Sequence, residues 1–342
     1  TYTPATQIPL GQNPGVPPFF GGKWTTNSHT GYTATSNTST ANIWVEWVAA
    51  RLGVAITPAE VGFVTTRVPC PAAATVGPNS CTGYAQGGSR VTDPNGIGKS
   101  AGALTIPIVD QISSHNTRVV QGFKTGFGDG DMVFVLGGNN DVFVQFGLVG
   151  ARAIAPEVAV AAVQTAATEL ATLVKNEIIA KGAKRVAVMS LPDFSVTPEF
   201  SSLPADNKAF LNQLTDAFNG ALLTGLNGSS ARIINLRALG AAVIANPSAF
   251  GITNVTQGAC DPAKISAFTG GRITNGSALF CNAAPASAFV APVPNLNGLK
   301  TGASASTYLF ADGVHPTTAG HKILGDQVWS ALKDFGWVPS NL

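Results

Sequence analysis

The chain has 342 residues, of which 45% are hydrophobic and only 11% are charged. This length suits one large domain or two smaller ones, and the apolar fraction is ample for a core. A formal net charge of +2 without any basic run argues against a nucleic-acid partner. Because charged residues fall well below the roughly 25% that is usual, uncharged polar residues must cover much of the surface.

The first third of the chain combines loops with short helices. Residues 1–40 are polar and contain many Pro and Gly residues, which indicates a long loop. Apolar residues at helical spacing predict a helix over residues 41–52, with Gly53 directly beyond its end. Residues 65–100 have the composition of a loop, and a further helix is expected over residues 106–115.

Buried strands and long helices alternate along the rest of the chain. Three short apolar runs predict strands buried on both faces, at residues 131–136, 185–191 and 231–236. Three longer segments predict helices, at residues 156–180, 206–226 and 318–335. Residues 245–310 have no regular pattern and are expected to be irregular. Strands that alternate with long helices indicate an α/β fold with a parallel sheet.

Four cysteines form two local groups, Cys70 with Cys81 and Cys260 with Cys281. Four cysteines allow three pairings, and sequence proximity favours a disulfide within each group. No pair has the C-x₂₋₄-C spacing of a zinc site. Two disulfides would indicate an oxidising compartment, and the alternative is four buried free thiols.

The N-terminus and the hydropathy pattern bear on location. The chain begins at Thr1 rather than Met, without a signal peptide, as an already processed chain would. Together with the cysteines, this predicts a secreted or periplasmic/extracellular protein. A membrane-spanning helix needs roughly 18 apolar residues, and polar residues interrupt the best candidate, residues 158–174. We therefore expect no transmembrane segment.

The strongest chemical signal is the sequence Asp-Gly-Val-His-Pro at residues 312–316, just before the last predicted helix. His315 can act as a general base because the ordinary pKa of histidine is about 6.5. Asp312, three residues earlier, can fix the tautomer of the imidazole and stabilise the imidazolium. The alternative is a capped loop in which Asp312 accepts backbone amides and His315 packs under the helix. The surrounding Gly and Pro residues favour the catalytic interpretation.

Two glycine-rich turns could donate hydrogen bonds to a developing oxyanion. Asn140 lies in a Gly-Gly-Asn-Asn-Asp sequence directly after the strand predicted at residues 131–136, and its side-chain amide could be one donor. Gly88 ends an Ala-Gln-Gly-Gly sequence whose backbone amides could be others. Each segment on its own is more typical of an ordinary turn.

Taken together and in this order, these segments resemble the SGNH (GDSL) family of serine esterases and lipases. Residues 85–88 resemble the family's second block, Gly-Asn-Asn-Asp at residues 138–141 matches the third, and residues 312–316 match the fifth. The resemblance implies a three-layer α/β/α fold with a flavodoxin-like parallel sheet of about five strands. It also implies that Asp312 and His315 are catalytic. Gly88 and Asn140 would bind the oxyanion.

The family's first block, Gly-Asp-Ser-Leu, is absent from residues 1–342. In the family this block ends the first strand and carries the serine nucleophile, and it would fall a few residues before Thr1. Without a hydroxyl to activate, Asp312 and His315 cannot carry out covalent catalysis. We therefore expect residues 1–342 to be a single domain that lacks its first strand. The serine would lie on a segment outside this chain, such as a separate N-terminal peptide.

The expected function is hydrolysis of carboxylic esters through a Ser-His-Asp triad completed from outside this chain, without a metal or cofactor. Phe143 and Phe146 follow the third block and are candidates for substrate binding in an acyl pocket, with core packing as an equal alternative. An acyltransferase that excludes water would use the same residues. A catalytically inactive binding or structural protein would explain the missing serine directly.

Overall fold

The computed structural model describes residues 23–28, 41–63, 66–70, 72–74, 76–120, 126–271, 273–288 and 295–341. Apart from residues 23–28, the loop expected over residues 1–40 lies outside the described residues. Within these ranges the chain forms eight α-helices and seven strands.

A three-stranded parallel sheet forms the centre of the fold. Its strands β3 (Val133–Val135), β4 (Val186–Met189) and β5 (Arg232–Ile234) are hydrogen-bonded in that order. Every residue of β4 is fully buried, and successive side chains enter different hydrophobic clusters, as Val188 and Met189 do. Because both faces of the strand are covered, its sequence is continuously apolar rather than alternating.

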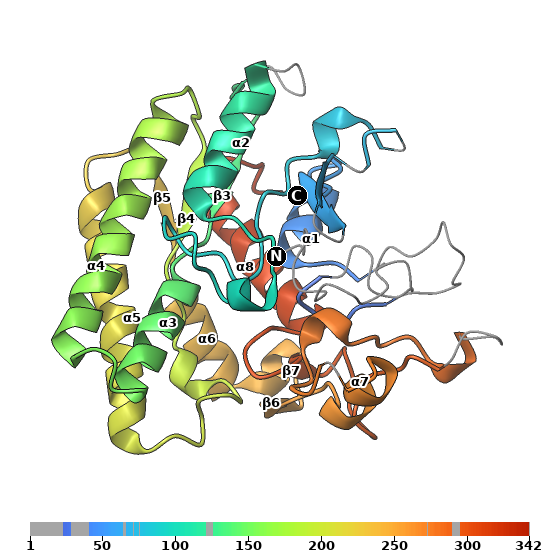
Figure 1. Cartoon of the computed structure of the whole chain (residues 1–342). Coiled ribbons are helices and arrows are strands. Elements are labelled where there is room, and N and C mark those ends of the chain that lie inside the picture. The colour runs from blue at the N-terminus through green and yellow to red at the C-terminus, as the bar shows by residue number, and fades with distance from the viewer. Residues whose placement is uncertain are drawn as a thin grey trace.

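Helices cover both faces of this sheet. The helices α4 (Pro156–Leu173) and α5 (Ala205–Leu226) pack against one face. The helices α1 (Trp44–Arg51) and α8 (Thr318–Asp334) pack against the other, as Figure 1 shows. The three-layer α/β/α fold expected from the sequence is therefore confirmed.

The helix α4 continues without a break into a π-helical segment, Val174–Ile179. A proline occupies its first turn, where the missing N–H costs no intrahelical hydrogen bond. Among the described helices, the combined segment Pro156–Ile179 is the one long and apolar enough to cross a membrane. However, Val163 and Leu170 are fully buried in the main hydrophobic cluster. This burial is typical of a core helix.

The contact between α1 and α8 requires a glycine. A Cβ atom at Gly325 would lie 3.0 Å from Trp47 Cβ and 3.2 Å from the Trp44 carbonyl oxygen, too close for a larger residue without movement. On the same face of α8, Val328 and Leu332 are fully buried. This packing holds α8 against α1, and α8 begins at Thr318, two residues after the segment 312–316.

The remaining elements are shorter. They are α2 (Ile108–Val120), α3 (Asn139–Gly150), α6 (Leu236–Ala245), α7 (Pro262–Phe268), the antiparallel strands β1 (Glu60–Phe63) and β2 (Thr66–Pro69), and the parallel strands β6 (Asn254–Gly258) and β7 (Tyr308–Phe310). The 3₁₀ helices are Pro78–Ser80, Lys99–Ala101, Phe194–Val196, Pro247–Phe250, Ala278–Phe280 and Ala286–Ala288. Figure 1 shows β6, α7 and β7 together in orange, beside the three-layer core.

Four local expectations differ from the structure. In the described residues the central sheet has three strands rather than about five, because β1–β2 and β6–β7 pair apart from it. Residues 245–310 contain β6 and α7 in addition to irregular segments. The helix expected at residues 106–115 begins at Ile108 and extends to Val120. A helix also begins at Asn139, where a turn was the favoured interpretation.

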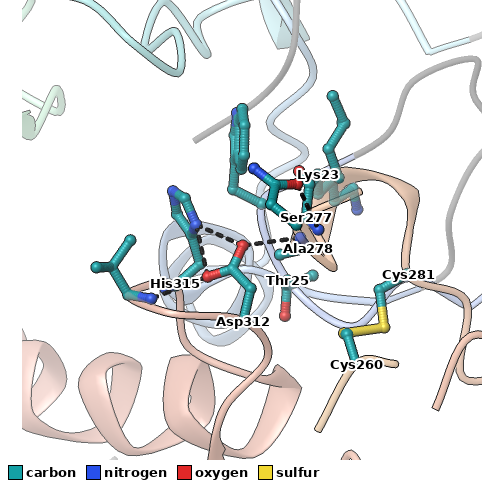
Figure 2. Close-up of polar contacts among 12 residues, drawn as sticks. Lys23, Thr25, Cys260, Ser277, Ala278, Cys281, Asp312 and His315 are labelled. Atoms are coloured by element: carbon teal, nitrogen blue, oxygen red, sulfur yellow. Dashed lines mark hydrogen bonds and ion pairs between the residues drawn. A yellow bond between two sulfur atoms is a disulfide. The ribbon is translucent and has the colours of Figure 1, made fainter. Parts of the chain in front are cut away.

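The structure contains two disulfides, Cys70–Cys81 and Cys260–Cys281. These are the pairs that sequence proximity favours, and all four cysteines are used. The first closes a loop beside the β1–β2 hairpin. The second joins Cys260, which lies between β6 and α7, to Cys281 in the loop region that approaches Asp312, as Figure 2 shows.

Candidate active site

The loop that carries Asp312 and His315 is closed by its own hydrogen bonds. The Ala311 N–H donates to the His315 carbonyl oxygen over 2.7 Å. Asp312 Oδ1 accepts the backbone N–H groups of Val314 at 3.0 Å and of His315 at 2.8 Å. An aspartate that binds the backbone two and three residues later stabilises a turn locally. The turn is therefore defined by hydrogen bonds between residues of the loop itself.

The two side chains of this loop form a hydrogen-bonded pair. His315 Nδ1 lies 3.0 Å from Asp312 Oδ1 and 2.9 Å from Oδ2. The Asp312 side chain is 8% exposed, whereas the His315 side chain is 32% exposed. Since Nδ1 faces the carboxylate, Nε2 lies on the far side of the ring, where it makes no hydrogen bond to any residue that the structure describes. The imidazole is thus oriented by an acid and open on its other nitrogen.

The carboxylate of Asp312 is held in its ionised form. Burial by itself would raise the pKa of this group, but the adjacent His315 and the backbone N–H donors outweigh it and lower the pKa below its ordinary value. Asp312 Oδ2 also accepts the backbone N–H of Ala278 over 2.8 Å. Figure 2 shows His315 and Ala278 meeting this carboxylate from opposite sides.

Trp24 packs directly on the imidazole. Its ring is stacked on the His315 ring, with 4.4 Å between ring centroids and an interplanar angle of 27°. His321, in α8, accepts the Trp44 N–H at Nδ1 and lies with Nε2 3.0 Å from the Trp24 carbonyl oxygen. Because Nδ1 is an acceptor, Nε2 carries the proton of a neutral ring. His321 therefore supports Trp24 and is not a second candidate base.

The two predicted oxyanion segments are tied to each other. Asn140 Nδ2 donates to the Ser89 carbonyl oxygen over 2.7 Å. The neighbouring Asp141, which is 2% exposed, accepts from Arg90 Nε at 3.0 Å and from the Val91 N–H at 3.1 Å. Burial raises the pKa of Asp141, although the Arg90 charge opposes this shift. One hydrogen of the Asn140 amide is thus used inside the protein, and the second makes no hydrogen bond to any residue in the described ranges.

The glycines at positions 87 and 88 are required by close contacts. Gly88 has φ of +80°, and a Cβ atom there would lie 2.4 Å from the Ile97 carbonyl oxygen. A Cβ atom at Gly87 would lie 2.0 Å from Trp24 Nε1. Neither glycine N–H donates to any residue in the described ranges, so both are candidates for binding an oxyanion.

Contacts through Trp24 join the two halves of the predicted site. The indole stacks on His315 and reaches Gly87 with its Nε1 edge. Asn140 in turn binds the carbonyl of Ser89, two residues from Gly87. The structure therefore brings the Asp312–His315 loop and the two glycine-rich segments to one region, at the carboxyl-terminal side of β3, where α/β folds commonly bind ligands.

The candidate substrate-binding residues Phe143 and Phe146 lie on α3 in an aromatic cluster. Ring centroids of Phe143 and Phe146 lie 5.4 Å and 5.9 Å from that of Phe200. The residue before it, Glu199, donates its backbone N–H to the Gly313 carbonyl oxygen over 2.9 Å. The cluster thus packs partly into the core and is connected to the Asp312–His315 loop.

No group of three or more His, Cys, Asp or Glu residues that could hold a metal ion occurs among the described residues. Sequence reasoning did not identify the roles of Trp24, His321 and Ala278. Nothing in the spacing of Trp24 indicates that it stacks on His315. The role of Ala278 could not be found from sequence, because only its backbone takes part.

Comparisons with known proteins agree with this geometry. The profile of the GDSL-like Lipase/Acylhydrolase family matches residues 21–328. An uncharacterized protein in the trpE-trpG intergenic region of Pseudomonas putida is 29% identical over 261 residues, which cover 70% of this chain and 38% of that protein. Esterase EstA of Pseudomonas aeruginosa is 30% identical over 152 residues, which cover 44% of this chain and 20% of EstA, and EstA of Pseudomonas putida matches equally well.

The chain spans well under half the length of these curated relatives. The family profile, however, covers both glycine-rich segments and the Asp312–His315 loop, together with the strands and helices that position them. The resemblance expected from the sequence motifs is confirmed: the chain belongs to the GDSL-like lipase/acylhydrolase family, a family of esterase- and lipase-type hydrolases.

Proposed function

We propose that this chain provides the base, the acid and two oxyanion donors of a serine carboxylesterase or lipase. The observation that carries the proposal is the His315–Asp312 pair, in which a buried carboxylate orients an imidazole whose Nε2 stays available. Two further observations support it: the unpaired N–H of Gly88 and the second amide hydrogen of Asn140 lie in the segments that Trp24 links to His315.

In the proposed reaction, His315 Nε2 takes the proton of a serine hydroxyl while the serine oxygen attacks the ester carbonyl. The Gly88 N–H and the Asn140 amide bind the oxyanion that forms. The tetrahedral intermediate expels the alcohol, which receives the proton from His315, and an acyl-enzyme remains. Water then attacks the acyl-enzyme with His315 again as the base, releasing the acid and the serine.

We propose that the serine lies on a segment outside residues 1–342, and that these residues form one domain without its first strand. Within the described residues, β3 pairs with β4 alone, so its other edge can accept a further parallel strand. A strand added there would end beside the Gly88 and Asn140 segments, where a nucleophile is required. A separate N-terminal peptide and a continuous longer chain would both satisfy this arrangement.

A fluorophosphonate probe tests the proposal, because it labels only an activated serine. The full-length protein, including any segment that precedes Thr1, should be labelled, and peptide mapping should place the label outside residues 1–342. His315→Ala should abolish labelling while the circular dichroism spectrum stays native. If the wild-type protein is not labelled, the chain is a non-catalytic binding or structural protein and the proposal is wrong.

The substrate and location follow as parts of the same proposal. The aromatic cluster around Phe143 and Phe146 would bind the acyl group of the ester, which predicts that Phe146→Ala alters the preference for acyl chain length. Product analysis with an added alcohol separates a hydrolase, which releases the acid, from an acyltransferase, which forms a new ester. The two disulfides support a secreted or periplasmic/extracellular location.

A further inference from the structure

The Asp312 carboxylate receives hydrogen bonds from two separate parts of the chain. Oδ1 is bound by N–H groups of its own loop. Oδ2 is bound by the backbone N–H of Ala278, which is 34 residues away in sequence. Rotation about the last side-chain bond of an aspartate is broad and weakly restricted. A donor on Oδ2 therefore determines how the carboxylate faces the imidazole.

We propose that Ala278 is a positioning residue for the catalytic pair: its backbone N–H fixes the orientation of the Asp312 carboxylate toward His315. This inference rests on the proposed function, because it assigns the element that maintains the proposed acid–base pair. The Cys260–Cys281 disulfide and the Asn27 side chain hold Ala278 in place.

The disulfide connects the two backbone segments that meet at Asp312. The Cys260 N–H donates to the carbonyl oxygen of Ala311, the residue directly before Asp312, over 2.8 Å. Its partner Cys281 donates its N–H to the Ala278 carbonyl oxygen over 3.1 Å, at the end of the short 3₁₀ helix Ala278–Phe280. Cys260 is thus bound to the residue before Asp312, and Cys281 is bound to the 3₁₀ helix that supplies the N–H of Ala278. Figure 2 shows the disulfide between these two cysteines together with Ala278 and Asp312.

Asn27 holds the same 3₁₀ helix from the other side. It is 1% exposed, and its Nδ2 lies 3.1 Å from the Ala278 carbonyl oxygen and 3.2 Å from that of Leu279. Its backbone N–H donates to the Cys281 carbonyl oxygen over 2.8 Å. The short segment that ends at Asn27 also carries Trp24, which stacks on His315. The carboxylate and the imidazole are thus supported by one connected unit.

Both cysteines of this bridge are buried: Cys260 is 3% exposed and Cys281 is 0% exposed. A reductant in solution cannot reach either sulfur atom without local opening of the fold. The bridge therefore acts as a permanent positioning device rather than a redox switch.

A single substitution tests Ala278 directly. Ala278→Pro removes the N–H and places the proline Cδ toward Asp312 Oδ2, so the carboxylate must move. The backbone tolerates proline here, because Ala278 begins a 3₁₀ helix and the preceding Ser277 has φ −47° and ψ 128°. Ala286→Pro is the matched control, since Ala286 is exposed and begins the nearby 3₁₀ helix Ala286–Ala288.

The first measurement uses the full-length protein and needs no turnover. In proton NMR at low pH, the wild-type chain should show the protected Nδ1 proton of His315, bound to Asp312. Ala278→Pro should lose this resonance through faster exchange, and Ala286→Pro should keep it. An unchanged resonance in Ala278→Pro overturns the inference. Absence of the resonance in the wild-type chain contradicts the His315–Asp312 pair itself, and with it the proposed function.

The second measurement compares the two disulfides by kinetics in the full-length protein, with p-nitrophenyl butyrate as substrate. Cys260→Ser/Cys281→Ser should lower kcat by about tenfold to a hundredfold, as expected for the loss of one hydrogen bond to a charged group, without changing KM. The control is Cys70→Ser/Cys81→Ser. Its two cysteines are 11 residues apart in sequence, a separation comparable with the 21 residues between Cys260 and Cys281.

The outcomes of the kinetic test are distinct. Loss of thermal stability in both double variants but loss of kcat only in Cys260→Ser/Cys281→Ser supports the inference. Equal kcat in both, or an effect on KM alone, overturns it. Absence of turnover in the wild-type protein instead refutes the proposed function.

Discussion

The buried histidine of α8 gives a prediction that does not depend on any catalytic role. His321 is 5% exposed, with Nδ1 accepting the Trp44 N–H and Nε2 3.0 Å from the Trp24 carbonyl oxygen. Complete burial lowers the pKa of His321 from 6.5 to about 3, because the imidazolium would lose its hydration. Protonation would also turn the Nδ1 acceptor into a second donor facing the Trp44 N–H.

The direction of the pH effect follows from this lowered pKa. Between about pH 3 and pH 6.5, the unfolded chain binds a proton at His321 that the folded chain does not. The free energy of unfolding therefore falls as the pH decreases below 6.5. Above pH 6.5 the stabilising contribution of the neutral His321 is fully present. At pH 5, which is 1.5 pH units below the pKa of the unfolded chain, each pH unit corresponds to ~1.36 kcal/mol. His321 therefore lowers the free energy of unfolding by ~2 kcal/mol at this pH.

The assay is urea unfolding of the full-length protein at pH 7.5 and pH 5.0, for the wild type and for His321→Gln. Glutamine keeps an amide donor for the Trp24 carbonyl but cannot titrate. The other ionisable groups are the same in both proteins, so their contributions cancel in the comparison. The wild type should lose ~2 kcal/mol more than His321→Gln on acidification. An equal loss in both proteins would show that His321 is protonated in the folded state and would refute the reasoning.

Three further predictions concern the proposed site and its support. Asp312→Asn should lower kcat by about 10⁴-fold with the fold intact, because the amide favours the wrong imidazole tautomer; a loss below tenfold in a p-nitrophenyl ester assay would contradict the triad. Asn140→Ala should lower kcat by about 10²–10³-fold, and a change confined to KM would rule out a role in the transition state. Gly87→Ala should destabilise the protein by about 1–3 kcal/mol in urea unfolding, because a Cβ atom would lie 2.0 Å from Trp24 Nε1. Gly147→Ala, in open space on α3, should instead stabilise it by about 0.5–1 kcal/mol, and similar effects at both glycines would argue against the contact with Trp24.

The layered fold was predictable because its signals are local. The strands at β3, β4 and β5 are continuous apolar runs, and the helices between them carry apolar residues at helical spacing over three turns or more. The strands β6 and β7 were not predictable, since β6 (Asn-Val-Thr-Gln-Gly) is not a continuous apolar run and the two strands pair across about fifty residues of sequence. The helix α3 was missed because its first residues, Asn139, Asn140 and Asp141, are typical of a turn.

The Asp312–His315 pair belongs to what the sequence determined by itself. The spacing of three residues, with Asp312 accepting the N–H groups of Val314 and His315, makes this pair a property of one short loop. The disulfide partners were also close enough in sequence for proximity to favour them. Interactions of this kind join residues that are close in sequence, so the sequence alone can indicate them.

The tertiary structure alone decided what surrounds that pair. The stacking of Trp24, the neutral state of His321 and the donation from Ala278 join segments that lie tens to hundreds of residues apart. The last of these uses a backbone N–H, which every residue except proline possesses, so no residue type marks it in the sequence. Folding selects such contacts through packing of the α1–α8 layer and the β6–β7 region, and only the folded arrangement determines which groups meet.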